Sequence, residues 1–195
     1  MKSLILASTS KYRKELLDRL HLQYNSQSPP VDEEDLKKQH RGNLELSQFL
    51  SIKKAESCVG PNTVVIGADQ LIQFEGQVIG KSGGLDKAFA QLKSMSGRTH
   101  ELITSFCIIA THTTSEEKRI IYTNRTRMHM RNLSDEQIRR YLQIESPYDC
   151  AGSYKIEKFG MSLFEKIDTD DFTAIQGLPL IALINALKEC GYEIP

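Results

Sequence analysis

The segment from Ser8 to Lys14 contains the residue types that phosphate binding requires, because hydroxyl side chains are followed by three basic ones. Hydrophobic residues precede it, so we expect a strand to end there and a helix to begin near Lys11. The free N–H groups and the dipole at a helix start favour an anion, and Ser8 and Arg13 would complete a seat for a triphosphate. The alternative is an ordinary capped helix with solvated basic residues.

Two acidic positions offer oxygen ligands for a divalent cation. Asp69 follows a hydrophobic run, and Glu33 belongs to the acidic segment 32–35. A loop carboxylate at the end of a strand can contact a ligand, and Mg²⁺ or Mn²⁺ combines carboxylates with substrate phosphates. Asp69 could also activate water. The alternative is that Asp69 begins a turn and that the acidic segment is a solvated charge run.

The tripeptide Gly80-Lys81-Ser82 matches the end of a Walker phosphate-binding loop, GxxxxGK[ST]. Only three residues separate Gly76 from Gly80, and the segment leaves a predicted hairpin instead of joining a strand to a helix. The spacing therefore argues against a Walker loop and against a P-loop kinase. Lys81 remains a candidate for a point charge on phosphate.

Other common sites find little support in the sequence. The five histidines form no HxxxH or HExxH pattern and no cysteine lies at ligand spacing from them, which argues against a zinc hydrolase. No Gly-x-Ser-x-Gly elbow occurs, which argues against an esterase. The formal net charge is zero, and aromatic residues do not alternate with basic ones, so we expect no nucleic-acid partner.

The composition is that of one folded domain, which we place at residues 1–195. Its 39% hydrophobic residues suffice for a continuous core without disulfides, and the four widely spaced cysteines predict free buried thiols in a reducing compartment. The first apolar run is shorter than a signal peptide's core, and no segment approaches the roughly 18 apolar residues of a membrane helix. We therefore expect a cytoplasmic protein without a membrane partner.

The elements that must position these side chains mix strand and helix patterns. We expect strands at 3–7, 24–28, 63–67, 71–74, 77–79, 101–111 and 119–130, and helices from about 11 and at 44–58, 85–95, 134–144 and 179–190. Segment 32–35 is expected to open a polar loop, and Ser134 with Gln137 to form a capping box. Because βα alternation is mixed with adjacent strands, the predicted fold class is α/β, a mixed twisted sheet with flanking helices and two lobes around a central cleft.

Taken together and in order, eight short segments resemble the Maf family of nucleoside triphosphate pyrophosphatases, which belong to the same broad fold as inosine triphosphatases. The resemblance runs from residue 4 to about residue 190. The family pattern usually has proline where this chain has Lys11 and Ser82, and these departures remove no charged group. The segments are 6–17, 31–33, 54–55, 67–70, 79–81, 96–100, 150–154 and 177–180.

The resemblance implies hydrolysis of a nucleoside triphosphate between its α and β phosphates, giving the monophosphate and pyrophosphate with a divalent cation, Mg²⁺ or Mn²⁺. It assigns the metal to Glu33 and Asp69 and the acceptance of a proton from water to Asp69, either directly or through the metal. It also implies a house-cleaning enzyme that forms a homodimer. Phosphate binding falls to Ser8, Arg13, Lys54 and Lys81.

Within the family, Tyr12, Gln70 and Glu157 match the positions that distinguish the 7-methyl-GTP branch, where the dTTP/UTP branch tends to carry arginine, threonine and glutamine. A methylated guanine is positively charged, so stacking on Tyr12 would gain about 0.5–2 kcal/mol of cation–π attraction. Glu157 would accept from the guanine N1–H and exocyclic amine, a donor pair that pyrimidines lack. The alternatives are core packing for Tyr12 and a surface charge for Glu157.

Two other functions stay open on the sequence. One is a dTTP/UTP pyrophosphatase of the same family. The other is a nucleotide-binding regulator of cell division without catalytic activity, because the family is historically associated with septum formation.

Overall fold

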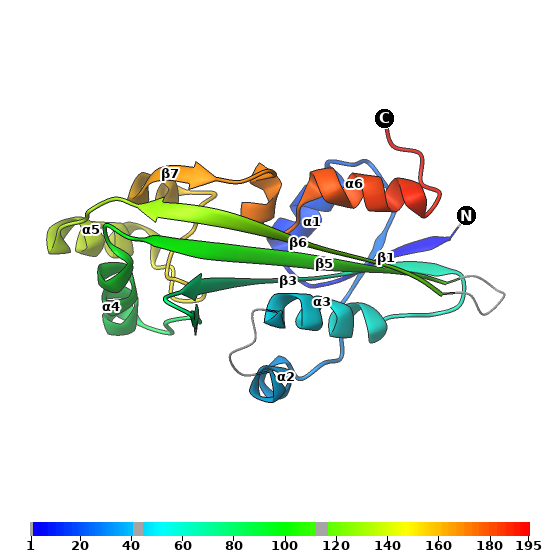
Figure 1. Cartoon of the computed structure of the whole chain (residues 1–195), viewed down its shortest axis with the longest axis horizontal. Coiled ribbons are helices and arrows are strands. Elements are labelled where there is room, and N and C mark those ends of the chain that lie inside the picture. The colour runs from blue at the N-terminus through cyan, green and yellow to red at the C-terminus, as the bar shows by residue number, and fades with distance from the viewer. Residues whose placement is uncertain (1, 41–44, 112–116) are drawn as a thin grey trace. The chain divides into compact units, whose positions relative to one another are not determined.

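The computed structural model in Figure 1 describes residues 2–40, 45–111 and 117–195. Helices and strands alternate along much of the chain, so the predicted mixed α/β class is confirmed. The elements are β1 (Ser3–Ala7), α1 (Lys11–Asp18), β2 (Asn25–Gln27), α2 (Glu33–Gln39), α3 (Leu46–Glu56), β3 (Thr63–Phe74), β4 (Gln77–Ile79), α4 (Leu85–Met95), β5 (Thr99–Thr111), β6 (Glu117–Met130), α5 (Asp135–Glu145), η1 (Phe159–Leu163), β7 (Phe164–Asp168), η2 (Phe172–Gln176) and α6 (Leu180–Glu189).

The strands form one seven-stranded sheet in the order β2-β1-β3-β5-β6-β7, with β4 paired to β3. Strand β1 is parallel to β2 and to β3, whereas the pairs β3–β4 and β6–β7 are antiparallel. Parallel neighbours need a crossover connection, and α1 supplies it between β1 and β2. The predicted mixed sheet with flanking helices is therefore confirmed.

The chain divides into two compact units. The first comprises residues 1–70, 104–124 and 171–195, and the second comprises 71–103 and 125–170. Strands β3, β5 and β6 each continue from one unit into the other. The prediction of a single domain over residues 1–195 stays a prediction.

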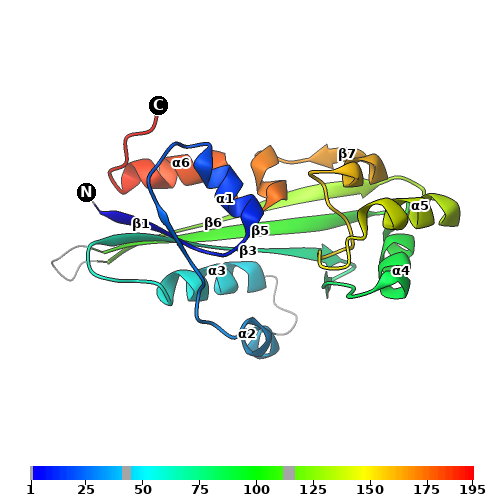
Figure 2. The same cartoon turned by 180° about the vertical axis from the view of Figure 1, so that it is seen from behind.

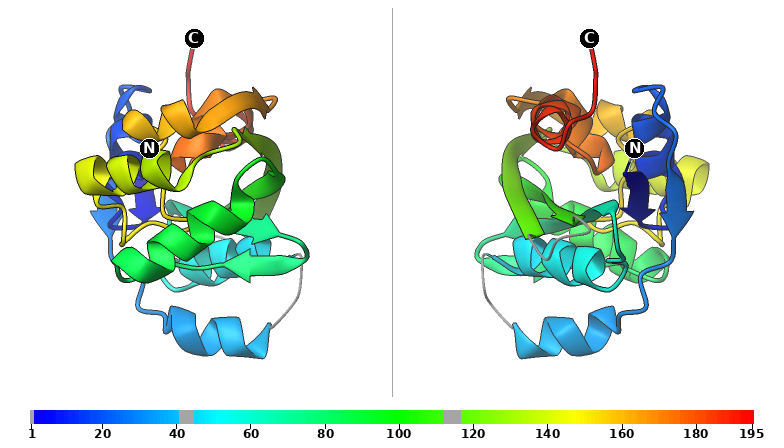
Figure 3. Two further views of the ribbon diagram at one scale, coloured as in Figure 1. Left: turned by 90° about the vertical axis from the view of Figure 1, so that its left-hand side faces the viewer. Right: turned by 90° about the vertical axis from the view of Figure 1, so that its right-hand side faces the viewer.

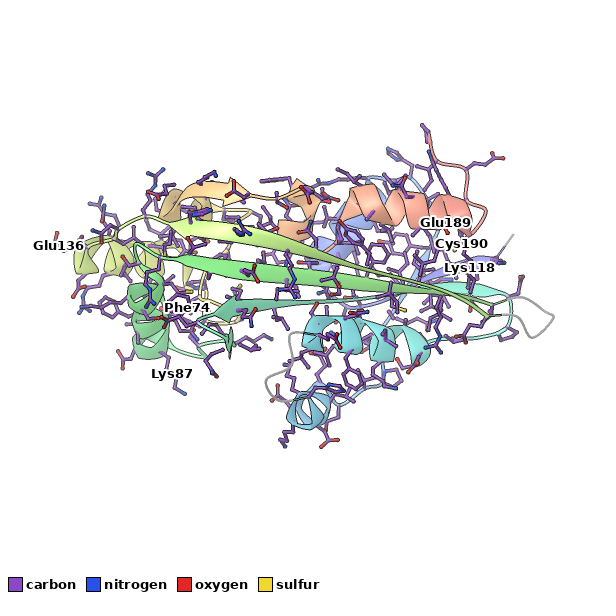
Figure 4. All side chains as sticks on the ribbon, in the orientation of Figure 1. Phe74, Lys87, Lys118, Glu136, Glu189 and Cys190 are labelled. Atoms are coloured by element: carbon purple, nitrogen blue, oxygen red, sulfur yellow. The ribbon has the colours of Figure 1, made fainter. Side chains whose placement is uncertain are left out.

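In the first unit, strands β1, β3 and β5 are buried on both faces. Helices α1 and α6 cover one face and α3 covers the other (Figures 1 and 2). Along β1 the side chains alternate, so Leu4 and Leu6 join the core beneath α1 and α6 while Ile5 and Ala7 join the core beneath α3. An ion pair between Lys118 of β6 and Glu189 of α6 adds a surface contact (Figure 4). Burial on both faces explains why these strands read as continuous hydrophobic runs.

Several local predictions agree with the structure, and two were wrong. Ser134 and Gln137 form the predicted capping box of α5. The segment 32–35 does not open a loop: Asp32 caps α2, and the acidic residues occupy its first turn, where the helix dipole favours negative charge. Strands predicted at 63–67 and 71–74 are one strand, β3, so Asp69 lies inside a strand and not in a loop.

Three further observations concern the cysteines, membrane-spanning helices and the start of α3. All four cysteines are free thiols, as predicted, but of the four only Cys107 is buried, and Cys58, Cys150 and Cys190 are half-buried. Among the residues that the structure describes, no helix combines the length and the hydrophobicity needed to cross a membrane. Leu44, where a helix was predicted to begin, lies outside the described residues, and α3 begins at Leu46.

Strand β3 and helix α3 approach each other closely at Gly67. A Cβ atom at this position would lie 2.2 Å from the carbonyl oxygen of Ser51 and 2.5 Å from the backbone nitrogen of Ala55. Backbone atoms cannot rotate away as the end of a flexible side chain can. The absent side chain of Gly67 therefore sets the separation between the strand and the helix that carry Asp69 and Lys54.

Gly67→Ala should lower the free energy of unfolding by at least about 2 kcal/mol, because the added methyl group overpacks the contact between β3 and α3. Urea denaturation of the purified variant measures this loss. Gly60→Ala is the matched control, since its new Cβ would meet only the Thr63 methyl group, at 3.5 Å. An equal effect of both substitutions would contradict the close approach.

The second unit contains an aromatic cluster around His100. Helices α4 and α5 pack against each other in this unit (Figure 3), and His100 of β5 is only 2% exposed. Its Nε2 lies 3.0 Å from the hydroxyl oxygen of Tyr154, and Phe164 packs nearby. Within the described residues, Nδ1 has no hydrogen-bond partner. Burial, and secondarily the charge of His129, lower the pKa of His100 to about 4.

This buried imidazole predicts a pH dependence of stability. Between pH 6.5 and 4 the unfolded chain binds a proton that the folded one does not, so stability is lost as the pH falls through this window, by up to about 3 kcal/mol. His100→Gln should remove this component from urea denaturation curves recorded between pH 7 and 4. His21→Asn, at an exposed position, should leave the profile unchanged; a His100→Gln profile identical to that of the unaltered protein would refute the assignment.

Candidate active site

The turn between β1 and α1 presents hydroxyls and an arginine at a helix start. The side chain of Ser10 caps α1 by accepting from the Arg13 backbone N–H at 3.5 Å. The buried Ser8 Oγ accepts from the Ser10 backbone N–H at 3.2 Å and from Arg13 Nη1 at 3.3 Å. These contacts use the acceptor lone pairs of Ser8 and leave its O–H proton for another acceptor.

The guanidinium of Arg13 is fixed from two sides. Besides the contact with Ser8, its Nε donates to the carbonyl oxygen of Gly177 at 3.0 Å. Burial lowers the pKa of Arg13, and the negative charges of Asp69 and Glu33 oppose this shift. Because a guanidinium stays protonated in proteins, a positioned positive charge remains, with further N–H groups that can reach an anion.

Lys54 joins two carboxylates that lie far apart in the sequence. Its side chain is 6% exposed, and its Nζ donates to Asp69 Oδ1 and to Glu33 Oε1, each at 2.8 Å. Asp69 comes from β3, Glu33 from the first turn of α2 and Lys54 from α3. Since both oxygens contact one nitrogen, they cannot be farther apart than twice this distance.

The two carboxylates differ in their affinity for a proton. Burial raises the pKa of Asp69, even though the charges of Lys54 and Arg13 pull it down. Burial by itself would raise the pKa of Glu33 as well. The hydrogen bond and the charge of Lys54 oppose this effect, and the pKa of Glu33 is lowered. Paired groups whose pKa values are pushed apart are typical of acid–base sites, and Asp69 and Glu33 form such a pair.

Gln70 follows Asp69 in β3, and its side chain is held by different partners. Its Nε2 donates to Thr104 Oγ1 at 2.9 Å and to the carbonyl oxygens of Ala174 and Ile175 at 2.9 and 3.1 Å. Carbonyl oxygens only accept, so the amide nitrogen must face them and Oε1 must point elsewhere. These contacts thus fix the direction of the Gln70 amide, with its nitrogen toward η2.

The first unit brings together most of the predicted site. Glu33, Lys54 and Asp69 are in direct contact, and Arg13, next to Ser8, lies within electrostatic range of both carboxylates. Tyr12 is half-buried on the first turn of α1. The two remaining predicted residues belong to the second unit, where their side chains are exposed and their roles stay predictions; they are Lys81 and Glu157.

The contribution of η2 was not predicted from the sequence. Its backbone carbonyls orient Gln70, and Gly177, just after it, orients Arg13. Every residue has a backbone carbonyl, so no residue type in the sequence indicates which carbonyl will orient another side chain. The only signal was the segment 177–180, which carried part of the family resemblance.

The donor set fits a cation that arrives together with phosphate. Among the described residues, no group of three or more His, Cys, Asp or Glu side chains is arranged to hold a metal ion. Proteins commonly bind Mg²⁺ through one or two carboxylates, with water and substrate phosphates completing the shell. Glu33 and Asp69 supply such a pair, and the ammonium of Lys54 shows that a positive charge is accommodated between them.

The fold and this site define a mixed α/β protein in which a carboxylate pair lies near Arg13 and the capped start of a helix. Residues 3–190 match the family described as Maf-like protein, and the chain belongs to the Maf family. A protein of Bdellovibrio bacteriovorus named 7-methyl-GTP pyrophosphatase is 53% identical over 97% of this chain and 98% of its own. Proteins with the same name from Pseudomonas aeruginosa and Cupriavidus metallidurans are 40% and 42% identical, over 100% and 97% of this chain and 100% and 94% of their own.

Removing the charge of Lys54 should strongly destabilise the first unit. Lys54→Met leaves the buried Asp69 without its partner, and the loss of one member of a buried ion pair typically costs about 3–5 kcal/mol. Lys53→Met is the matched control from the same helix; its pair with Glu56 is more exposed than that of Lys54 with Asp69 and should be worth less than about 1 kcal/mol. Urea denaturation at pH 7 compares the two variants, and equal losses would show that the Lys54 cluster is not buried as described.

Proposed function

We propose that this protein is a nucleoside triphosphate pyrophosphatase that hydrolyses 7-methyl-GTP between the α and β phosphates with Mg²⁺ or Mn²⁺. The products are 7-methyl-GMP and pyrophosphate. The observation that carries this proposal is the contact of one buried ammonium with two carboxylates, Glu33 and Asp69, near the fixed guanidinium of Arg13. The names of the similar full-length relatives support the choice of substrate.

The carboxylates have distinct roles in this proposal. Glu33 and Asp69 hold the divalent cation, which when bound would neutralise phosphate oxygens and make bound water more acidic. Asp69 accepts the proton that water loses as it attacks the anhydride. Glu33 serves as a ligand of the cation and takes no proton.

The basic residues and hydroxyls stabilise the phosphates. Arg13 is held by Gly177 and Ser8, so little reorganisation is needed when charge builds up on the departing pyrophosphate. An ammonium has three donors, and two of those of Lys54 are used by the carboxylates, which leaves one for a phosphate oxygen. Lys81 keeps its proposed role as a further point charge on the basis of the resemblance.

Recognition of the base is assigned to Tyr12, Gln70 and Glu157. Tyr12 would stack on the charged methylguanine, and Glu157 would accept from its two neighbouring N–H donors. Gln70, whose nitrogen is already engaged, can offer only an acceptor to the base. A homodimer, a cytoplasmic location and the absence of a nucleic-acid partner stay predictions from the sequence.

The test is a substrate panel of 7-methyl-GTP, GTP, dTTP and UTP at one Mg²⁺ concentration, with release of pyrophosphate as the measurement. We expect pyrophosphate and monophosphate in equal amounts, fastest from 7-methyl-GTP and none when the metal is chelated. Asp69→Asn should reduce turnover by about 10²–10⁴-fold, the usual contribution of a general base. Glu33→Gln should also reduce it, whereas Glu34→Gln, a neighbouring exposed carboxylate, should not.

The possible outcomes separate the alternatives. No pyrophosphate above the chelated control would defeat the proposal. Equal or faster turnover of dTTP and UTP would defeat only the choice of substrate. Tight nucleotide binding in calorimetry without any turnover would favour the regulatory function.

A further inference from the structure

The 3₁₀ segment η2 and the glycine after it contact two residues of the proposed site through backbone atoms. Gly177 O accepts from Arg13 Nε at 3.0 Å, and two carbonyls of η2 accept from Gln70 Nε2 at 2.9 and 3.1 Å. We call residues 171–177 the η2 clamp. Through these hydrogen bonds the clamp orients Arg13 and Gln70.

The buried carboxylate of Asp171, which is 4% exposed, holds this clamp at its base. Its Oδ1 accepts from the backbone N–H and the hydroxyl of Thr173 at 2.9 and 2.6 Å. Its Oδ2 accepts from the backbone N–H of Ile181 at 2.8 Å, and Thr173 Oγ1 accepts from the backbone N–H of Leu180 at 2.7 Å. One side chain thereby ties the start of η2 to the start of α6 through charge-assisted hydrogen bonds.

A second buried side chain secures the clamp from the sheet. Thr104 of β5, which is 1% exposed, donates its hydroxyl proton to Ala174 O at 2.9 Å and accepts from Gln70 Nε2 at 2.9 Å. The hydroxyl therefore connects the clamp and the glutamine in one network. In a network of this kind, the position of the Gln70 amide depends on the position of the η2 carbonyls.

We propose that Asp171 is a positioning residue of the pyrophosphatase, which acts through the η2 clamp on Arg13 and Gln70. The inference rests on the proposed function, since it assigns Arg13 to phosphate and Gln70 to the base. Loss of the carboxylate lets η2 shift, so the guanidinium loses its fixed direction and the amide of Gln70 its fixed orientation. A misplacement of about 1 Å near a reacting group can reduce the rate by about 10²-fold.

The test compares Asp171→Asn with the unaltered protein by measuring kcat and KM for 7-methyl-GTP and for UTP. Asn keeps one acceptor oxygen but cannot accept from both Thr173 and Ile181. We expect kcat/KM for 7-methyl-GTP, divided by kcat/KM for UTP, to fall about tenfold, because a group that binds the base is misplaced. Simple destabilisation would lower the amount of folded enzyme and scale both substrates equally, leaving the ratio unchanged.

Three further variants test the positioning role of Asp171 more specifically. Asp135→Asn, the same change at the exposed start of α5, should leave both the ratio and KM unchanged. Thr104→Val preserves the side-chain shape and removes the bridging hydroxyl, so it should shift the ratio in the same direction even if Asp171→Asn fails to fold. In a Gln70→Ala background, Asp171→Asn should change the ratio no further, because its effect on the base passes through Gln70.

The outcomes distinguish this inference from the proposed function. Turnover by the unaltered protein together with unchanged ratios in Asp171→Asn and Thr104→Val would overturn the inference and leave the function standing. Without turnover by the unaltered protein, the proposed function fails, and the ratio of dissociation constants for α,β-methylene analogues of 7-methyl-GTP and UTP tests the clamp instead. Unchanged ratios of dissociation constants, or no binding at all, would then overturn the inference as well.

Discussion

Burying the ammonium of Lys54 would be strongly unfavourable if Glu33 and Asp69 did not both contact it. This contact constrains three elements at once, because the partners lie on α2, α3 and β3. The close approach at Gly67 sets the separation of the last two. An arrangement that concentrates two carboxylates around one buried cation is costly for stability alone, and it is the arrangement that a metal–polyphosphate substrate needs.

Other elements of the first unit place the positive charge of Arg13 near the carboxylates of Glu33 and Asp69. Helix α1 begins at the end of β1, so its capped start and Arg13 lie at the edge where β3 carries Asp69. The η2 clamp then removes the freedom of the guanidinium by accepting its Nε–H. Polar groups that are oriented before the substrate arrives need little reorganisation when charge develops, which is the main source of electrostatic catalysis.

Local signals predicted the parts of this site that depend on neighbouring residues. The hydroxyls before Arg13 predicted the start of α1, because capping involves residues only three positions apart. The acidic segment containing Glu33 was misread because the same residues suit a solvated loop and a first helical turn. The contacts of Lys54 and the clamp at Asp171 could not be predicted from local patterns, since they join segments separated by many residues and, in η2, use backbone carbonyls. The family resemblance pointed to Lys54 and to Gly177, but not to Asp171 or η2.

The central claim is that Glu33 and Asp69 bind one metal ion together with the substrate phosphates. A crystal structure of the unaltered protein with Mn²⁺ and a non-hydrolysable analogue of 7-methyl-GTP, with the anomalous signal of manganese, locates the ion directly. The account predicts an anomalous peak coordinated by both carboxylates and by phosphate oxygens. A peak coordinated by other side chains, with Glu33 and Asp69 still bound only to Lys54, would contradict it.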